Sequence, residues 1–390
     1  MVEKTKDGGM KSPLKPAHLP EHLYRLCSYF LPRLMFLRSV HGAQISWGDI
    51  TIALQDFPAG LQDLSSAEFW EEWMQRWNQQ GYEYSRLAGE SGSTAGAKAA
   101  WRSAAACFHW AEFMYFSDPV QKTQMRQAVK ECFMKSLEHT KLPLSTGEFM
   151  YGDVRVPYYL VLPDVSSDSK KRWPCVILSN GLDSVTEVEV FAFAEQFLAR
   201  GIAVFMFDGP GQGINLGCNS IDMQFENVVQ KIIARLRFES AVDSSRLGFF
   251  GISFGGYLAL RVARYLGTEF RAVVNLSGGP SLSPYATLPR RLKEDFRYAF
   301  MGGDDADMQR LFDQLRLTEP EQNTVDTLSV HGALDDIFPL KELQHFHQYL
   351  GINHPLKIYP TEAHVCLNYI SQYSIEVSDW LETKLVKSAD

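Results

Sequence analysis

The pattern of hydrophobic and polar residues changes character near residue 142. Before this point apolar residues recur every three or four positions, as in SSAEFWEEWMQRWNQQGYEYSRLA, which is the spacing of one face of an α-helix. The segment AGAKAAWRSAAACFHWAEFMYF continues the pattern after a Gly/Ser turn. Ser65 or Ser66 can cap the first helix, with Glu68 in its first turn. We therefore predict a helical module at 19–145, after a flexible, proline-broken N-terminus at 1–18.

The most apolar stretch of this module, LYRLCSYFLPRLMFL at 23–37, does not have the length of a membrane span. Arg25, Pro32 and Arg33 interrupt it, whereas a membrane-spanning helix needs about 20 predominantly apolar residues. The stretch is better explained as a buried amphipathic helix. The module as a whole is interpreted as helix pairs packed on one another, with a structural or lid role.

From residue 146 onward the chain alternates strand signals with helical ones. Amphipathic helices separate the apolar segments PCVILSN, AVFMFDG, RLGFFGIS, RAVVNLSG, TLSVHG and LKIYP. Such alternation predicts an α/β domain at 146–390, with a mostly parallel sheet and helices on both faces. The segment 283–323 breaks the rhythm. We predict that it is a helical insertion that covers the site.

Composition and charge narrow the classes of partner. The chain has 390 residues, 45% of them hydrophobic, and its formal net charge is -8. No cluster of basic residues offers a face for nucleic acid or an anionic membrane, so a small-molecule ligand is expected. The six cysteines lack C-x-x-C spacing and are interpreted as reduced thiols of a cytoplasmic protein. The N-terminus has no apolar signal-peptide core, so secretion is not expected.

The candidate chemistry centres on GFFGISFGGY at 248–257. The strand RLGFFGI leads to Ser253 and the helix FGGYLALRVARYL leaves from it, which is the strand-turn-helix context of a nucleophile elbow. Gly251 and Gly255 carry no side chains, so strand and helix can approach closely across the tight turn. The Ser253 hydroxyl is then expected at the C-terminal edge of the sheet, where open α/β sheets bind ligands.

Two further residues complete the site predicted around Ser253. A serine hydroxyl is a weak nucleophile near neutral pH, so it needs a histidine base and a carboxylate that orients the histidine. Asp335 follows the strand TLSVHG and His364 follows the strand LKIYP, so both come after Ser253 in the required order. Asp336 is the competing carboxylate, but Asp335 stands three residues after Gly332, where a strand end aims its side chain inward. The candidate catalytic residues are Ser253, Asp335 and His364.

Acyl chemistry also needs backbone donors for a developing oxyanion. One donor is the amide of Phe254, which follows the nucleophile at a helix N-terminus. The loop ILSNGLDS supplies the second, because Gly181 allows close approach and the amide of Leu182 comes next. We therefore predict an oxyanion hole formed by the backbone amides of Leu182 and Phe254.

Other polar motifs have structural explanations. The segment FDGPGQG at 207–213 lacks the lysine and the G-x-G-x-x-G spacing of a phosphate loop, and is interpreted as a tight turn in which Asp208 is structural. His109 lies on an aromatic helix and is predicted to be packed, whereas His331 is predicted to be a core residue or to support the site. No histidine or carboxylate cluster has metal-ligand spacing, so neither a metal nor a cofactor is expected.

With ILSNGLDS, FDGPGQG, GISFGG, HGALDDIFP and EAHVC, the chain resembles an α/β-hydrolase. Within that superfamily it is similar to the fungal polyketide-shortening hydrolases of melanin pathways, to the bacterial 2,6-dihydropseudooxynicotine hydrolase and, more distantly, to the fermentation-respiration switch esterases. The similarity spans nearly the whole chain, because those proteins also place a helical module before the catalytic domain. One departure is Asn180, where the resemblance leads us to expect a second glycine.

The resemblance implies a homodimer whose helical module lines the active site. It also implies hydrolysis of a C-C bond next to a carbonyl, a retro-Claisen cleavage of a polyketide-derived or aromatic ketone of secondary metabolism. Ser253 would attack the carbonyl, His364 would take its proton, and the amides of Leu182 and Phe254 would hold the oxyanion. Three alternatives stay open: a carboxylester, lactone or thioester hydrolase with the same triad, a nonhydrolytic cyclase or condensation enzyme, and a hydrolase-fold receptor or binding protein.

Overall fold

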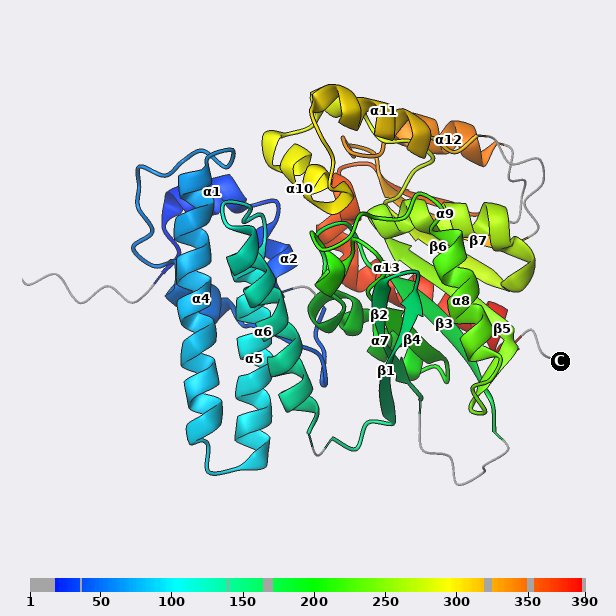
Figure 1. The fold of residues 1–390 in the computed structure, drawn as a ribbon, viewed down its shortest axis with the longest axis horizontal. Coiled ribbons are helices and arrows are strands. Elements are labelled where there is room, and N and C mark those ends of the chain that lie inside the picture. The colour runs from blue at the N-terminus through cyan, green and yellow to red at the C-terminus, as the bar shows by residue number, and fades with distance from the viewer. Residues whose placement is uncertain are drawn as a thin grey trace, which may run out of the picture.

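A helical region and a sheet domain lie side by side in the computed structural model of the chain (Figure 1). The structure describes residues 18–35, 37–138, 140–163, 171–318, 325–348 and 354–387. Nearly all of the predicted flexible N-terminus, residues 1–17, thus lies outside the described residues. None of the helices in these ranges combines the length and the apolar composition that a membrane crossing requires.

Among the described residues, six helices build the helical region, and the three longest lie side by side (Figure 1). Side chains cap their N-termini: the Ser66 hydroxyl accepts from the Phe69 amide at 3.1 Å, and Asp118 caps the last helix, which starts with Pro119. Of the two serines that could cap this helix, Ser65 and Ser66, the structure therefore shows that Ser66 does so. The helices are α1 (Glu21–Cys27), α2 (Leu31–Met35), α3 (Trp47–Leu54), α4 (Ala67–Glu90), α5 (Thr94–Glu112) and α6 (Pro119–Leu137).

The stretch 23–37 forms the two short helices α1 and α2, so the prediction of one amphipathic helix is wrong. In a continuous helix the ring of Pro32 would clash with the carbonyl of Ser28, and the missing N–H would leave that carbonyl unpaired. The chain therefore breaks after Cys27 and starts again at Leu31, with proline tolerated in the first turn of α2.

The described residues also form one eight-stranded sheet, in the order β1-β2-β4-β3-β5-β6-β7-β8. β1 and β2 are an antiparallel hairpin, in which Tyr151 pairs with Val154 across the turn at Gly152 and Asp153. β2 also pairs antiparallel with β4, and all remaining pairs are parallel. The strands are β1 (Leu144–Tyr151), β2 (Val154–Val161), β3 (Trp173–Ser179), β4 (Ala203–Phe207), β5 (Val242–Ile252), β6 (Ala272–Leu276), β7 (Asp326–Gly332) and β8 (Leu356–Tyr359).

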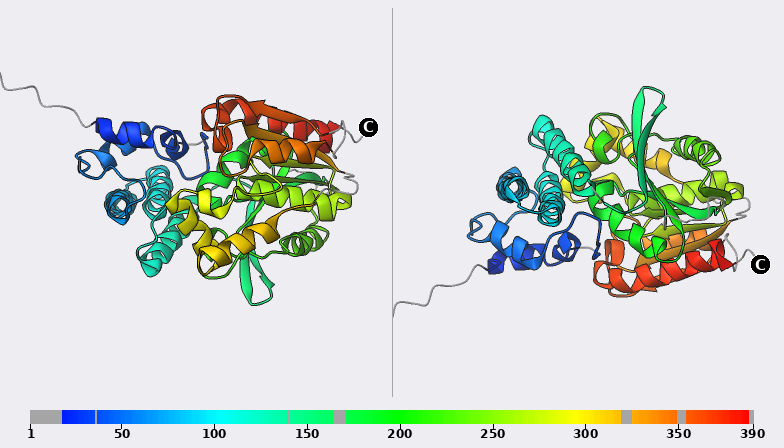
Figure 2. Two further views of the ribbon diagram at one scale, coloured as in Figure 1. Left: turned by 90° about the horizontal axis from the view of Figure 1, so that it is seen from above. Right: turned by 90° about the horizontal axis from the view of Figure 1, so that it is seen from below.

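Helices cover both faces of this sheet, as the alternating pattern predicted (Figure 2). α7 and α13 pack on one face, and α8, α9 and α12 pack on the other. Consecutive residues of β5 show the alternation, because Phe249 joins one hydrophobic cluster and Phe250 joins the other. The predicted fold class is therefore confirmed. These helices are α7 (Phe191–Leu198), α8 (Glu226–Leu236), α9 (Phe254–Leu266), α12 (Leu340–His347) and α13 (Ile370–Leu385).

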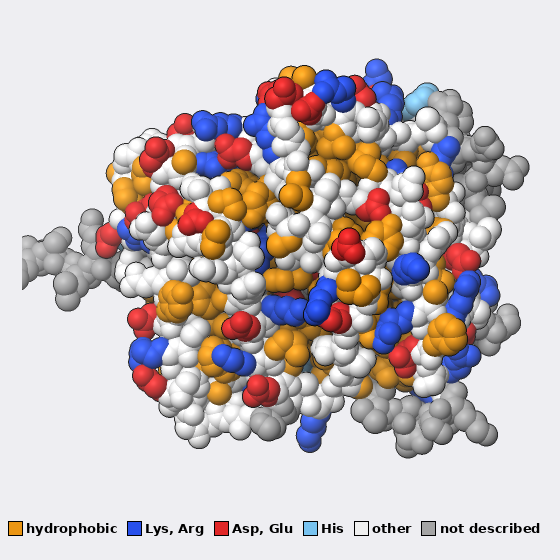
Figure 3. Space-filling model, viewed as in Figure 1, with side chains coloured by type: hydrophobic (Ala, Val, Ile, Leu, Met, Phe, Trp, Pro, Cys, Tyr) orange, Lys and Arg blue, Asp and Glu red, His pale blue; other side chains and the backbone are white. Residues whose placement is uncertain are grey.

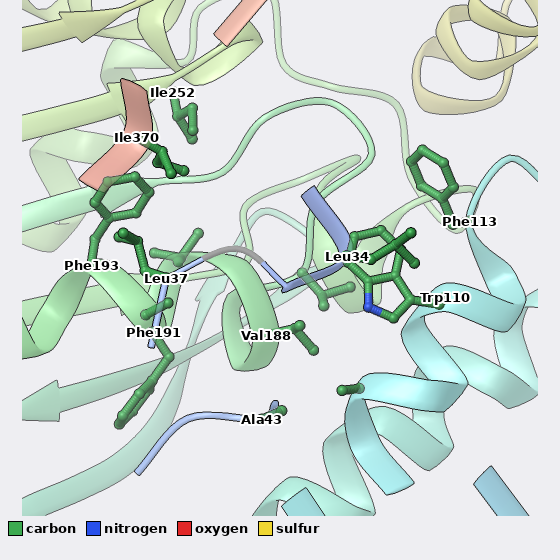
Figure 4. Close-up of a cluster of buried hydrophobic side chains, with 14 of the residues drawn as sticks. Leu34, Leu37, Ala43, Trp110, Phe113, Val188, Phe191, Phe193, Ile252 and Ile370 are labelled. Carbon is green, nitrogen blue, oxygen red and sulfur yellow. The ribbon is translucent and has the colours of Figure 1, made fainter. Parts of the chain in front are cut away.

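The helical region shares a continuous hydrophobic core with the sheet domain (Figure 4). Leu34 of α2 and Trp110 and Phe113 at the end of α5 join the same cluster as Phe191 of α7 and Ile252 of β5. All of these side chains are at most 6% exposed. Because burying such a side chain contributes about 1.5–3 kcal/mol, the helical region is held against the sheet domain by core packing.

An insertion between β6 and β7 carries α10 (Arg290–Phe300) and α11 (Asp305–Leu315). α10 lies where the helical region meets the sheet domain (Figure 1). Residues 319–323 of the predicted helical insertion lie outside the described residues. On the face drawn in Figure 3, acidic and basic side chains are interspersed, and hydrophobic ones gather along its middle.

A buried ion cluster lies at the end of α5. The Glu112 carboxylate is 0% exposed; it accepts hydrogen bonds from Lys122 Nζ at 2.5 Å, Arg126 Nε at 3.1 Å and His109 Nδ1 at 3.0 Å. Burial by itself raises the pKa of Glu112, but Arg126 and Lys122 outweigh it and hold this pKa well below its ordinary value. Arg126 Nη1 also donates to the carbonyl of Gly213 in the sheet domain, so the cluster links the two parts of the molecule.

Replacing Glu112 by glutamine should lower the free energy of unfolding by about 3–5 kcal/mol, because Lys122 and Arg126 would stay buried without a counter-charge. Chemical denaturation followed by circular dichroism measures the loss. Glu90→Gln is the matched control: its partner Arg86 is 60% exposed, so at most about 1 kcal/mol should be lost. Equal losses in both variants would contradict a stabilising role for the buried cluster.

Candidate active site

Ser253 occupies the turn between β5 and α9 with φ 59° and ψ -121°, a strained conformation for a residue with a side chain. The two flanking glycines are required by close backbone approach. A Cβ on Gly251 would lie 1.8 Å from the carbonyl oxygen of Gly255, and a Cβ on Gly255 would lie 2.4 Å from the carbonyl oxygen of Asn180. The turn thus has the geometry of a nucleophile elbow.

The structure joins Ser253, His364 and Asp335 in one hydrogen-bonded chain. Ser253 Oγ lies 2.7 Å from His364 Nε2, and His364 Nδ1 lies 2.7 Å from Asp335 Oδ2. Asp335 Oδ1 accepts from the amides of Ile337 and Phe338 at 2.9 Å each. Burial raises the pKa of Asp335, but His364 outweighs it and lowers this pKa below its ordinary value, so the carboxylate is ionised near neutral pH.

The loop that carries His364 is held from two sides. Val365 and Cys366 adopt φ 68° and 51°, and the Val365 amide donates to Ser277 Oγ at 3.1 Å. The hydroxyl of Tyr29, from the helical region, donates to the carbonyl oxygen of His364. Nothing in the sequence pointed to Tyr29, since it lies between two short helices and far from the other site residues along the chain.

The two amides predicted for the oxyanion hole lie at the site. Leu182 and Phe254 line the same cavity as Ser253 and His364. A Cβ on Gly181 would lie 3.3 Å from Ser253 Cβ, so the loop passes directly beside the serine. No acceptor within the described residues takes a hydrogen bond from the amide of Leu182 or of Phe254. Both donors are therefore available to a ligand.

Asn180, which stands where a glycine was expected, fastens this loop to the segment FDGPGQG. Its Nδ2 atom donates to Asp208 Oδ1 at 2.8 Å and to Thr186 Oγ1 at 3.0 Å, and all three side chains are at most 2% exposed. The Asp208 Oδ2 atom accepts from the amide of Ile214 at 3.0 Å. The side chains thus position the loop that carries Leu182.

Arg33 of α2 holds the other end of the loop. Its Nη atoms form two parallel hydrogen bonds of 2.9 Å each to the carboxylate of Asp183, which follows Leu182. Its Nε atom donates to Glu189 Oε1 at 2.6 Å. Such bidentate pairs fix geometry as well as charge. In the sequence Arg33 stands out only because it interrupts an apolar stretch. An arginine in such a stretch, however, also indicates that a buried acidic partner lies nearby.

Ser253 and His364 open into a cavity of about 130 Å³. The helical region and the insertion both contribute to the walls. The cavity is lined by Arg33, Met114, Leu182, Asp183, Ser184, Glu189, Ile252, Ser253, Phe254, Leu292, Asp295, Phe296, Ile337, Phe338, His364 and Val365.

The structure also locates the other polar residues singled out in the sequence. His109 is buried as predicted, and its Nε2 atom lies 3.6 Å from Glu189. His331 is also buried. Its Nε2 atom lies 2.8 Å from the carbonyl oxygen of Phe338 and 3.7 Å from Asp335 Oδ2. Asp336, the competing carboxylate, is exposed. In the part of the chain that the structure describes, no group of three or more His, Cys, Asp or Glu side chains could hold a metal ion.

Comparison with known families identifies the superfamily of the chain. The family model of the prolyl oligopeptidase family matches residues 190–388, and that of the FrsA-like esterases matches residues 69–287. The chain belongs to these α/β-hydrolase families. The predicted α/β-hydrolase fold, with an N-terminal helical region, is thus confirmed, and so is the expectation that the chain is an enzyme.

Curated relatives of this hydrolase are bacterial and fungal. It is 29% identical over 290 residues to the 2,6-dihydropseudooxynicotine hydrolase of Paenarthrobacter nicotinovorans. The aligned residues cover 73% of this chain and 76% of that protein. It is 31% identical to hydrolase LUC6 of Fusarium sp (53% of this chain, 52% of that protein) and 32% identical to 20-hydroxy-prefusarin hydrolase FUS2 of Gibberella moniliformis (50% and 49%). The hydrolase thus spans about half the length of these fungal relatives.

Solved structures share the fold. The crystal structure of the 2,6-dihydroxy-pseudo-oxynicotine hydrolase matches with a TM-score of 0.72 at 23% identity, over 88% of this chain and 94% of that one. The structure of AbyA5 matches with a TM-score of 0.67 at 15% identity, over 82% and 93%. The predicted resemblance to the bacterial hydrolase, to fungal hydrolases and to FrsA-like esterases is confirmed.

Proposed function

We propose that this hydrolase cleaves a C-C bond next to a carbonyl, by a retro-Claisen reaction, in a polyketide-derived or aromatic ketone of secondary metabolism. The observation that carries the proposal is the hydrogen-bonded chain from Ser253 through His364 to Asp335, beside two free backbone amides. The similarity to 2,6-dihydropseudooxynicotine hydrolase and to two fungal hydrolases supports the choice of substrate class.

The reaction follows from the positions of these groups. Ser253 Oγ adds to the carbonyl carbon while His364 Nε2 takes the hydroxyl proton, and Asp335 stabilises the imidazolium. The amides of Leu182 and Phe254 donate to the oxyanion. When the intermediate collapses, the C-C bond breaks and its electron pair leaves as an enolate, whose carbon takes the proton from His364. Water, deprotonated by His364, then releases the acid from Ser253.

Hydrolysis of an ester, lactone or thioester is the second candidate, because the FrsA-like esterase family matches more than half of the chain and an ester needs the same triad and amides. The cavity favours the C-C reaction. Ile252, Phe254 and Phe296 are at most 6% exposed and give it apolar walls, which keep water away from an enolate until its carbon is protonated.

The test uses 1-phenylbutane-1,3-dione and the ester phenyl acetate in water labelled with heavy oxygen. C-C hydrolysis should release a carboxylic acid and a ketone, with one labelled oxygen in the acid. An ordinary esterase should turn over the ester alone. A nonhydrolytic cyclase should incorporate no label, and a binding protein should turn over neither substrate; either result would contradict the proposal.

The homodimer is also proposed from the resemblance, with the helical region as its contact. Several large apolar side chains of this region are exposed, including Val40 at 70%, Tyr82 at 63% and Trp47 at 44%. Sedimentation equilibrium measures the mass of the particle in solution, and a monomer at micromolar concentration would contradict this assignment.

A further inference from the structure

Asp295 of α10 is a buried carboxyl group that has no hydrogen-bond partner. The residue is 1% exposed, and neither carboxyl oxygen is paired within the described residues. It lines the cavity into which Ser253 and His364 open. Because buried polar groups in folded proteins are nearly always hydrogen-bonded, an unpaired carboxyl at a cavity wall indicates a group that a ligand satisfies.

The cations around Asp295 are already engaged by other carboxylates. Lys122 and Arg126 both donate to Glu112. Arg33, which also lines the cavity, is bound to the carboxylates of Asp183 and Glu189. No ion pair joins Asp295 to a described residue. Asp295 is therefore an acid without a counter-ion of its own.

The environment of the Asp295 carboxyl favours its protonated form. Burial and the nearby carboxylate of Asp183 raise its pKa well above the ordinary value, although Lys122 and Arg126 oppose them. A neutral carboxyl has an O–H that donates a hydrogen bond, whereas a carboxylate only accepts. In its protonated form Asp295 therefore supplies a hydrogen-bond donor on the cavity wall formed by α10.

The helix presents this donor between apolar neighbours. Asp295 and Phe296 follow Leu292 by three and four residues, which places them on the same face of α10 as Leu292. All three line the cavity. Glu294 and Arg297 instead line a separate groove outside it. Asp295 and Ser253 thus line the same cavity, so one substrate can contact both.

We propose that Asp295 contacts the substrate as a carboxylic acid and donates a hydrogen bond to a second oxygen, two carbons away from the carbonyl that Ser253 attacks. This inference rests on the proposed C-C hydrolysis and narrows its substrate class to 1,3-dicarbonyl compounds. When the C-C bond breaks, its electron pair delocalises onto that second oxygen, and the hydrogen bond strengthens as the enolate forms. The proton on Asp295 stays in place, while His364 delivers the proton to carbon.

The test compares two substrates in three variants. The measured quantity is the kcat/KM for 1-phenylbutane-1,3-dione divided by the kcat/KM for 4-nitrophenyl acetate. Asp295→Leu should lower this ratio by roughly 100-fold, since a donor to a developing oxyanion is lost. Asp295→Asn should restore the ratio to within about 10-fold of the parent, because the amide also donates. Glu294→Gln, a neighbouring acid on the same helix but outside the cavity, should leave the ratio unchanged. Thermal melting checks that each variant is folded.

A pH profile provides a readout that a structural role would not change. In the parent the ratio should fall as pH rises through the pKa of Asp295, and in Asp295→Asn this step should vanish. A ratio that rises with pH would mean that an ionised Asp295 holds a cationic group, which overturns the proposal. An unchanged ratio in Asp295→Leu, whether both activities fall equally or neither falls, would overturn the proposal as well.

Failure of the C-C reaction is distinguishable from failure of the role of Asp295. If the parent cleaves the ester but not the diketone, the proposed function is wrong. Binding of 1-phenylbutane-1,3-dione to Ser253→Ala is then compared with binding to the double variant Ser253→Ala, Asp295→Leu by calorimetry. At least about 10-fold weaker binding to the double variant supports the contact, since one hydrogen bond in a buried site is worth about that much. Equal binding, or none, overturns it.

Discussion

Ser253→Ala should lower kcat by about 10⁶-fold, because the covalent acyl-enzyme can no longer form. The alanine leaves the free amides of Leu182 and Phe254 in place, so a residual rate above that in water is expected from the oxyanion hole. Initial rates on the substrate of the parent measure the loss. Intact-mass analysis after treatment with a fluorophosphonate measures the second consequence, which is the disappearance of a single adduct.

The control for this experiment is Ser281→Ala, a buried serine that does not line the cavity. It should keep both the rate and the adduct. If Ser253→Ala were as active as the parent on the true substrate, acyl transfer would be excluded and a cyclase without a covalent intermediate would be favoured. A variant that kept its affinity while the parent showed no turnover would favour a binding protein.

Asp335→Asn should lower kcat by about 10⁴-fold while the fold is retained. The asparagine keeps an oxygen for the amides of Ile337 and Phe338, which bind Asp335 Oδ1 at 2.9 Å. Its NH₂ group, however, faces His364 Nδ1 and selects the tautomer whose Nε2 carries a proton, so the histidine cannot accept the proton of Ser253. Steady-state kinetics measures the loss, and circular dichroism verifies the fold.

Asp336→Asn is the matched control, because it makes the same chemical change at the adjacent position. Asp336 is exposed, and its main-chain carbonyl, which the substitution leaves unchanged, accepts a hydrogen bond from the Ser283 hydroxyl. Its kcat should stay within about 3-fold of the parent, as is usual for an exposed side chain outside the site. The opposite pattern, with Asp336→Asn inactive and Asp335→Asn active, would show that the carboxylate was assigned wrongly.

Much of the sheet domain could be predicted because its signals are local. Short apolar runs bounded by turn residues indicate buried parallel strands, and each of the six runs quoted from the sheet domain overlaps a strand of the structure. The glycines at 251 and 255 likewise indicate a tight turn from neighbouring residues alone, since an added Cβ at either one would clash with backbone atoms. Ser253, Asp335 and His364 could be aligned in advance because all three follow strands whose ends meet at one edge of a sheet.

Prediction was less successful in the helical region. Pro32 is visible in the sequence, but the direction in which the chain turns after it depends on packing against the sheet domain. The break between α1 and α2 places Arg33 against Asp183 and Glu189, and Tyr29 against the carbonyl of His364. No local pattern reports such contacts, because each partner lies in a different element.

The amino-acid sequence by itself determined the alternation of strands and helices in the sheet domain, the elbow at Ser253 and the identity of its two polar partners. These features depend on neighbouring residues and on the regular geometry of parallel strands. Only the tertiary structure decided that Arg33 holds the loop of Leu182 through Asp183 and that Asp295 faces the cavity without a partner. The burial and protonation of a carboxyl group depend on every element packed around it, and those elements come together only when the chain is folded.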